Sequence, residues 1–289
     1  MIITINDDFD MKKIAASGQC FRVKEFDEGL FRFITGEHVL YIRRQSEATY
    51  DISCSEEIWK KIWFPYFHLD RNYSEIRGRI GVRDKYLLAA SYEGQGIRIL
   101  RQDPWEMIVT FIISQQKTIP SIKNCVESLC LAYGNKIATP LEELYTFPTA
   151  ERLASVKEET LREYKLGYRA PYIVDAATKI SSGYIDLQDL YTRSDKKVFN
   201  TLKQISGIGD KVSNCICLFA YGRTRLAPID TWISKVIDRE YKGKNPFPKY
   251  KDAAGIMQQY IFYYALTHKK ELKKTATRNE LYANHIMND

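Results

Sequence analysis

The chain has 289 residues, of which 45% are hydrophobic and 27% charged, so it can bury the core of two domains or of one large one. Its net charge of +7, from 43 basic and 36 acidic residues, permits a nucleic-acid partner without requiring one. The six cysteines form no CxxC pair and no zinc-ligand spacing, which excludes those two kinds of site and favours free thiols in a reducing compartment.

The sequence also bears on location. Three aspartates close behind Met1, at positions 7, 8 and 10, are not typical of a signal peptide, and no apolar run approaches the roughly 18 residues of a membrane-spanning helix. We therefore expect a soluble cytoplasmic protein, monomeric and without a membrane partner. In a prokaryote it would be associated with the nucleoid if its partner is DNA.

Residues 1–98 are predicted to form an antiparallel sheet with helices packed against it. Short β-branched or aromatic runs separated by Gly, Asp and Glu are typical of strands, and such runs lie at 2–5, 21–26, 30–35, 39–44 and 48–53. A helix is expected at about 55–67, with Ser55 as its N-cap. Within this part, residues 17–22 (SGQCFR) are expected to form a turn that enters a strand.

The pattern becomes helical near residue 98. Asp103 and Pro104 provide an N-cap followed by proline at the first helical position, and apolar residues recur at i, i+3, i+4 and i+7 from Trp105. A polar loop at 114–118 precedes the next helix, which Pro120 starts. We therefore predict an α+β protein with an N-terminal sheet domain at 1–98 and an all-α domain at 99–289.

Residues 196–222 are predicted to form a helix, a tight hairpin and a second helix. Gly207 and Gly209 allow a positive φ and a close approach of the backbone to a partner. Asp210 is expected to cap the second helix, which Gly222 ends. Unpaired N–H groups at such a helix start attract phosphate, and we assign this role to Gly207, Gly209 and Val212.

Carbonyl groups at the end of the first helix are free to bind a cation. We expect Lys203 and Ile205, with Ile208 in the hairpin, to be able to hold a monovalent cation through their carbonyl oxygens.

Two charged residues near the hairpin are candidates for catalysis. Lys211 lies in the first turn of the second helix, where the positive end of the helix dipole disfavours an ammonium ion, so its amine is a candidate nucleophile. Asp230 precedes the apolar-periodic run that starts at Trp232, so it is a natural N-cap that stays ionised. Singly, such residues are more often a solvated lysine and a plain cap.

The combination of Gly207, Gly209, Lys211 and Asp230 resembles the helix–hairpin–helix superfamily of DNA glycosylases, and in particular the 8-oxoguanine DNA glycosylase family. The resemblance covers most of residues 15–265. It implies a bifunctional glycosylase and lyase that flips 8-oxoguanine out of duplex DNA. Lys211 and Asp230 would be catalytic, and no cofactor would be required. The cysteine pattern that binds an iron–sulfur cluster in some related glycosylases is absent.

The resemblance also implies further site residues. The carbonyl of Gly18 would accept a hydrogen bond from the N7–H that 8-oxoguanine has and guanine lacks. Gln258, Phe262 and Cys215 would bind the base, while Gln116, Tyr168 and Arg169 would fill the gap it leaves and read the orphaned cytosine. From the residues alone, these positions equally suit a turn, an aromatic core helix and ordinary loops.

Two positions depart from the pattern of eukaryotic members, which carry Arg where Ser121 stands and His, near a backbone phosphate, where Trp232 stands. Trp232 remains a candidate DNA contact, and we expect weaker selectivity for the base opposite the lesion. Two other functions stay open: a broader glycosylase for alkylated bases, which Lys211 disfavours, and a non-catalytic DNA-binding module, which has no need of Asp230. The tail after Lys269 matches the family poorly and is assigned no role.

Overall fold

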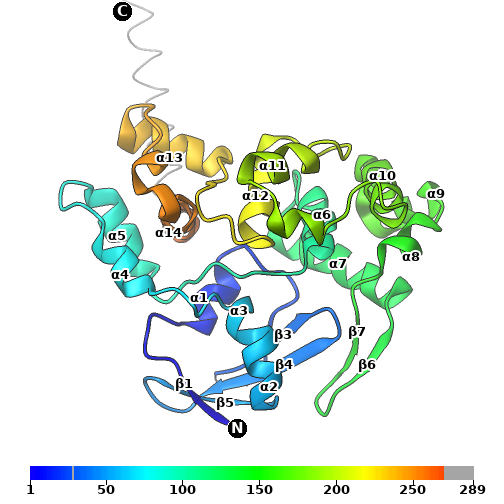
Figure 1. The fold of residues 1–289 in the computed structure, drawn as a ribbon, viewed down its shortest axis with the longest axis horizontal. Coiled ribbons are helices and arrows are strands. Elements are labelled where there is room, and N and C mark those ends of the chain that lie inside the picture. Colours follow the sequence, from blue (N-terminus) through cyan, green and yellow to red (C-terminus); the bar gives the residue numbers. More distant parts are fainter. Residues whose placement is uncertain (28, 270–289) are drawn as a thin grey trace, which may run out of the picture.

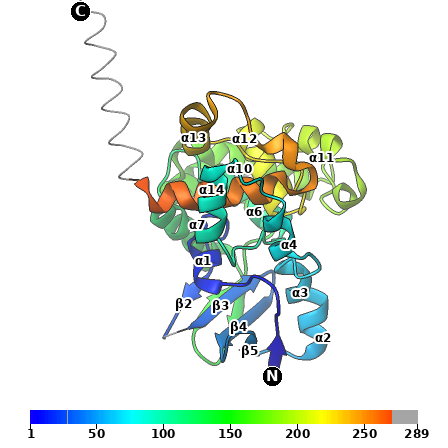
Figure 2. The ribbon, with the colours of Figure 1, turned by 90° about the vertical axis from the view of Figure 1, so that its left-hand side faces the viewer.

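The computed structural model describes residues 1–27 and 29–269 of the chain. A layer of helices lies above an antiparallel sheet, and the segment that follows α5 runs between the two layers (Figures 1 and 2). The α+β class is confirmed. The tail after Lys269 lies outside the described residues.

The sheet contains five antiparallel strands in the order β1-β5-β4-β3-β2. Its strands are β1 (Ile2–Thr4), β2 (Lys24–Glu25), β3 (Leu30–Thr35), β4 (His38–Arg44) and β5 (Thr49–Ile52). The strand predicted at 21–26 is wrong in length. Arg22 lies outside the observed strand, and its guanidinium donates to Glu127 in the helical layer and to the carbonyl of Tyr145.

The region from 53 to 98 is helical, although residues 1–98 were predicted to be mostly strands. Ser55 is confirmed as an N-cap, since its hydroxyl accepts a bond from the Ile58 N–H. The expected helix at 55–67 is a continuous run of α2 (Glu56–Ile58), a π-helical turn (Trp59–Trp63) and α3 (Phe64–Tyr66). The helices α1 (Met11–Ala16), α4 (Tyr73–Gly78) and α5 (Lys85–Glu93) were not predicted.

The helical layer begins with α6 (Pro104–Ile113), whose N-cap Asp103 is confirmed by a bond from the Glu106 N–H. The α-helices that follow are α7 (Ile119–Tyr133), α8 (Ala150–Ala154), α9 (Glu158–Leu161), α10 (Ala170–Ser181), α11 (Asp195–Leu202), α12 (Asp210–Phe219), α13 (Thr231–Tyr241) and α14 (Ala254–Thr267). Shorter turns of π or 3-10 helix lie at η2 (Arg162–Leu166), η3 (Gly167–Arg169), η4 (Asp189–Thr192) and η5 (Phe247–Ala253).

A hairpin that the sequence did not predict, β6 (Lys136–Ala138) and β7 (Glu143–Tyr145), reaches from the helices to the sheet (Figure 1). Its Glu142 pairs with Lys24 and Arg32, at 2.9 and 3.0 Å. The hairpin therefore ties the two layers together beside β2 and β3.

Two hydrophobic clusters form the core. One lies between the sheet and α1 to α3, and the other fills the helical layer. The helical cluster includes Phe21, Tyr73 and Leu87 from the N-terminal part of the chain. We propose the domain boundary near residue 98, with the reservation that α4 and α5 pack with the helical layer.

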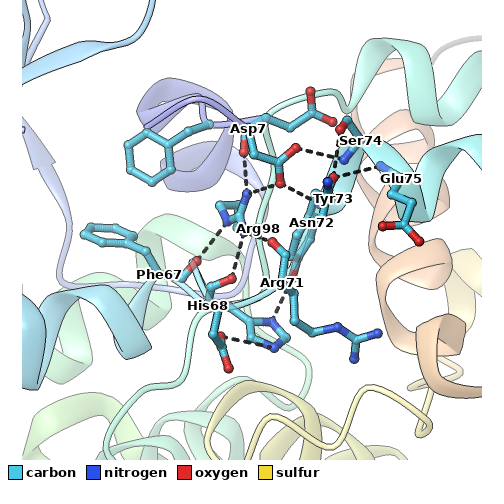
Figure 3. Close-up of polar contacts among 12 residues, drawn as sticks. Asp7, Phe67, His68, Arg71, Asn72, Tyr73, Ser74, Glu75 and Arg98 are labelled. Carbon is cyan, nitrogen blue, oxygen red and sulfur yellow. Dashed lines mark hydrogen bonds and ion pairs between the residues drawn. The ribbon is translucent and has the colours of Figure 1, made fainter. Parts of the chain in front are cut away.

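Arg98 stands at this junction and is fully buried (Figure 3). Its guanidinium donates to the carboxylate of Asp7 and to the carbonyls of Phe67, Asp8, His68 and Arg71, at 2.6 to 3.0 Å. These five bonds hold together the N-terminal segment, the turn after α3 and the strand-like segment that leads into α6.

Candidate active site

A small cavity of about 50 Å³ brings together six residues that the sequence singled out: Gly18, Lys211, Cys215, Asp230, Gln258 and Phe262. They come from four separate parts of the chain. The turn before β2, helix α12, the N-terminus of α13 and helix α14 all meet here. The cavity therefore joins the predicted catalytic pair to the predicted base-binding residues.

Lys211 lies in the first turn of α12, and its Nζ is 5.6 Å from the centre of the Phe111 ring. Among the described residues its amine forms no ion pair within 4 Å, although the chain is rich in carboxylates. Cys215 lies one turn further along α12. Burial raises the pKa of the Cys215 thiol, and the neighbouring Lys211 charge partly opposes that rise. The amine thus faces the cavity without a salt-bridge partner that would hold it away.

Asp230 is confirmed as the N-cap of α13. Its Oδ1 accepts a hydrogen bond from the Ile233 N–H at 2.8 Å. One carboxylate oxygen is thereby anchored at the positive end of a helix dipole, and the residue lines the cavity.

Gly18 adopts a positive φ of 74° in the turn after α1. A Cβ at this position would lie 2.9 Å from Cε1 of Phe262, so the turn and α14 are in close contact. The carbonyl of Gly18 accepts no hydrogen bond from any described residue. Only glycine fits here, and its carbonyl is available to a ligand.

Gln258 is 3% exposed, and its Oε1 is buried without a hydrogen-bond partner among the described residues. Leaving a buried amide oxygen unpaired costs about 1–3 kcal/mol. Because the same side chain lines the cavity, this unpaired group indicates a place for a ligand with a hydrogen-bond donor.

Four further residues line the cavity that the sequence reasoning did not assign: Phe111, Phe219, Pro228 and Gln259. The rings of Phe111 and Phe219 are stacked, with centroids 5.7 Å apart and an interplanar angle of 16°. They belong to buried faces of α6 and α12, and nothing in their spacing separates them from core residues. Gln259 could have been noticed, because it is a second amide on an apolar helix.

The hairpin between α11 and α12 agrees only in part with prediction. Gly207 has a φ of 79°, and a Cβ there would lie 2.3 Å from the ring of Tyr172. Gly209, in contrast, has a φ of −90°, and no atom lies within 4 Å of the position that its Cβ would take. The fold alone does not require glycine at 209, so the residue leaves open space above the start of α12.

The expectation that Asp210 caps α12 is wrong. Asp210 is the first residue of the helix and pairs with Lys203 at 2.5 Å, while the N-cap is Gly209, which has no side chain to offer. The N–H groups of the first turn, including that of Val212, therefore lack a capping side chain. The predicted cation ligands Lys203, Ile205 and Ile208 lie in the same turn, where the Ile205 carbonyl accepts the Ile208 N–H at 3.1 Å.

The two predicted DNA-contacting loops lie against each other. Gln116 is exposed with a φ of 52°, and Tyr168 is 43% exposed. Arg169, which the resemblance assigns to reading the orphaned cytosine, is buried here rather than open to DNA. It donates to the carbonyls of Gln115 and Leu166, and its guanidinium lies 4.2 Å from the Tyr168 ring centre. Its guanidinium thus joins the loop at 166–170 to the loop at 114–118, where it supplies a donor to the Gln115 carbonyl.

Trp232 is partly exposed at the start of α13, with the amines of Lys235 and Lys269 5.7 and 5.9 Å from its ring centre. Ser121 lines a groove of about 550 Å³ between α7 and the turn at 163–165. No group of three His, Cys, Asp or Glu side chains placed to hold a metal ion occurs within residues 1–27 and 29–269. Over the same residues, no helix is long and apolar enough to cross a membrane.

A helix–hairpin–helix, a lysine at the start of its second helix and an aspartate N-cap on the next helix define a class of base excision DNA repair proteins. Residues 109–260 match the family model of HhH-GPD superfamily base excision DNA repair proteins, and residues 1–108 match that of the 8-oxoguanine DNA glycosylase N-terminal domain.

Solved structures extend this likeness over nearly the whole chain. MBOgg1, in complex with a low-affinity DNA ligand, is 36% identical with a TM-score of 0.87, over 92% of this chain and 95% of that one. The 8-oxoguanine glycosylase/lyase of Clostridium acetobutylicum, in complex with DNA that has cytosine opposite 8-oxoG, is 32% identical with a TM-score of 0.84, over 93% and 98%. The chain belongs to the 8-oxoguanine DNA glycosylase family.

Among curated relatives, an N-glycosylase/DNA lyase of Saccharomyces cerevisiae is 35% identical over 190 residues, which is 61% of this chain and 50% of the relative. The N-glycosylase/DNA lyase OGG1 of Arabidopsis thaliana is 26% identical over 232 residues, 76% of this chain and 63% of the relative. The match thus spans about half to two thirds of the length of these curated relatives.

Proposed function

We propose that the protein is a bifunctional DNA glycosylase and lyase that excises 8-oxoguanine from duplex DNA. One observation carries the proposal: a single cavity holds the Lys211 amine, the anchored carboxylate of Asp230 and the buried amide oxygen of Gln258. Within residues 1–27 and 29–269, the amine has no ion-pair partner and the amide oxygen no hydrogen-bond partner. A nucleophile, a charge stabiliser and a base-reading group are the three parts that glycosidic bond cleavage by an amine requires.

The chemistry follows from these positions. As the bond between the base nitrogen and C1′ breaks, positive charge builds on the sugar, and the Asp230 carboxylate stabilises it. The neutral amine of Lys211 forms a bond to C1′, while the base departs with the electron pair of the broken bond and takes up a proton. The nitrogen then gives up a proton, its lone pair breaks the bond from C1′ to the ring oxygen, the oxygen takes up a proton as a hydroxyl, and a Schiff base results. Removal of a C2′ proton then expels the 3′ phosphate by β-elimination.

Reading of the base would use the groups to which the described part of the chain offers no partner. The carbonyl of Gly18 accepts the N7–H of the lesion, and the amide of Gln258 pairs with the Watson–Crick edge. A cavity of about 50 Å³ holds only a water or two. The pocket therefore has to open for a purine, and the Phe262 ring, which lies against Gly18, is the side chain placed to move and then to stack on the base.

The DNA backbone would be held at the start of α12. Its uncapped N–H groups and the open space at Gly209 suit a phosphate next to Gly207 and Val212. Tyr168 and Gln116 are exposed enough to enter the gap left by the flipped base, and Arg169 would have to leave the Gln115 carbonyl to reach an orphaned cytosine. Trp232 with its two lysines would lie along the strand.

A monovalent cation at the hairpin is part of the same proposal. Carbonyl oxygens are suitable ligands for such an ion, and Lys203, Ile205 and Ile208 would supply them. The ion would steady the turn that carries the phosphate site, with no role in bond breaking.

The test is borohydride trapping on a duplex with 8-oxoguanine opposite cytosine, with Lys211→Gln beside the wild type. We expect a covalent protein–DNA adduct that the variant does not form. Base release without an adduct would mean that water is the nucleophile. Release of alkylated bases alone, or binding without turnover on either lesion, would instead favour the two other functions considered from the sequence.

A further inference from the structure

Gln259 is a buried amide beside the cavity for which the proposed chemistry has no use. It is 2% exposed, on a helix whose other buried residues are almost all apolar. Its Nε2 donates to the carbonyl of Ser17 at 2.6 Å. Burying an amide costs free energy unless it is hydrogen-bonded, so this bond fixes the direction of the side chain.

The Ser17 carbonyl belongs to the peptide unit that leads into Gly18. Ser17 is itself fully buried. Within the described residues, the bond from Gln259 is the only hydrogen bond between α14 and the turn at 17–19. The remaining bonds to this turn come from N-terminal segments: Gln19 bonds Leu100 and Arg98, and Gln102 bonds the Gln19 carbonyl.

Helix α14 thus contributes three residues to the cavity: Gln258, Gln259 and Phe262. Gln258 and Phe262, one turn apart, line the cavity, and Gln259 holds the turn that carries the third base-reading group. Between the turn and α14, the bond from Gln259 lies beside the close approach of Gly18 to the Phe262 ring. The bond therefore helps to set the distance between the Gly18 carbonyl and the Gln258 amide.

We infer that Gln259 is a positioning residue for lesion recognition: it sets the Gly18 carbonyl at the spacing that accepts N7–H of 8-oxoguanine, and so sets the preference for the lesion over guanine. This inference rests on the proposed function. Gln259 itself does not contact the reacting atoms.

The experiment measures binding preference in a background that cannot turn over. Lys211→Gln protein is titrated with duplexes that differ only in 8-oxoguanine or guanine opposite cytosine, with and without Gln259→Met. Methionine keeps the length and packing of the side chain but cannot donate. We expect the preference for the lesion to fall about tenfold, with the affinity for the guanine duplex unchanged. A merely structural defect would weaken both duplexes alike.

Three further measurements make the test decisive. With Lys211 intact, Gln259→Met should nick a preformed abasic site at the wild-type rate, since no base is read there. Gln95→Met, the same substitution at an amide that bonds Asp8 away from the cavity, should change nothing. If Gln259→Met does not fold, Gln259→Glu replaces it, and its preference for the lesion should recover as the pH is lowered and the carboxyl regains a proton to donate.

The outcomes separate the two proposals. No preference for the lesion in the Lys211→Gln parent, together with no excision by the wild type, overturns the proposed function. A clear preference in the parent that Gln259→Met leaves unchanged overturns the inference about Gln259 alone.

Discussion

The junction around Arg98 and the cavity at Lys211 are both buried and polar, yet they treat their polar groups in opposite ways. All five N–H donors of Arg98 find an acceptor inside the protein, and its charge is balanced by Asp7 (Figure 3). At the cavity, the Gln258 oxygen and the Gly18 carbonyl have no partner among the described residues. The guanidinium that holds the junction is thus satisfied inside the protein, whereas the two acceptors at the cavity are left open to a ligand.

The junction and the cavity also differ in how their polar groups contribute to the free energy of unfolding. A satisfied buried network adds stability only as a whole, because removing one member exposes the rest as unpaired groups. An unsatisfied group already carries that penalty in the free protein, and a ligand removes it on binding. The two regions should therefore respond oppositely to the loss of a polar side chain.

The largest effect is expected for Arg98→Met. The change removes the charge partner of Asp7, which keeps only the N–H groups of Tyr73 and Ser74, and it leaves buried carbonyls unpaired. The carbonyls that lose their donor are those of Phe67, Asp8 and Arg71. The free energy of unfolding should therefore fall by about 3–5 kcal/mol. Urea denaturation at pH 7 measures it. Arg79→Met, which removes a half-exposed pair with Asp252 and Glu75, is the control and should cost less than about 1 kcal/mol. Equal losses in the two variants would contradict the contrast.

The same junction predicts sensitivity to acid. Burial, with the charges of Arg101, Arg71 and Arg98, lowers the pKa of His68 to about 2. Below pH 6.5 the histidine of the unfolded chain binds a proton that the folded protein does not bind. The free energy of unfolding should therefore fall by about 1.4 kcal/mol for each unit by which the pH is lowered. The buried Glu106, whose pKa is raised to about 7, opposes this between pH 7 and 4.5 because the folded state binds its proton more tightly.

His68→Asn isolates the histidine term, and asparagine tolerates the positive φ of 56° at this position. As the pH is lowered from 6 to 5, the difference in unfolding free energy between wild type and variant should shrink by about 1.4 kcal/mol. A difference that does not change with pH would mean that His68 is protonated in the folded protein.

The sequence singled out six residues that line one cavity, whereas several elements of the fold around it were not predicted. Lys211 and Asp230 were found because helix starts have sharp rules for charge and capping, and these hold locally. The prediction for Asp210 was wrong because Gly209 is the N-cap of α12, and the Asp210 carboxylate pairs with Lys203 instead. Capping rules name the residue types but not which of two neighbours is used.

Features that depend on contacts distant in the sequence were out of reach. Helix α1 has only six residues, which is too few to show a periodic pattern. Strand β2 is shorter than predicted, and Arg22 before it makes contacts with Glu127 and Tyr145 that are more than 100 residues away in the sequence. The burial of Arg169 depends on a carbonyl 54 residues away, and the bond of Gln259 on one 242 residues away. Local pattern carries no information about either.

At the cavity, Gln258→Met should separate function from stability. The variant loses an amide whose oxygen is unpaired, so the free energy of unfolding should stay the same or rise by up to about 1 kcal/mol. Excision of 8-oxoguanine should fall about ten- to a hundredfold, because the Watson–Crick edge loses its partner. Single-turnover excision and urea denaturation of the same preparation measure both. A marked loss of stability would place Gln258 among the structural groups instead.

Ser121 lines an open groove of about 550 Å³, which offers a second comparison with the satisfied junction. The resemblance implies that this position, Arg in eukaryotic members of the family, helps to read the base opposite the lesion, and we propose that the groove lies beside that base. An open groove accepts either a pyrimidine or a purine opposite the lesion, so we expect the wild type to cleave 8-oxoguanine opposite adenine nearly as well as opposite cytosine. Ser121→Arg should reduce cleavage opposite adenine about tenfold relative to cytosine, because a guanidinium that can pair with cytosine is unpaired beside adenine. Ser121→Met, of similar reach but uncharged, should lower both rates alike. A wild type that already cleaves hundreds of times more slowly opposite adenine would mean that another group reads the opposite base, and Arg169, once released from the Gln115 carbonyl, is the group that could do so.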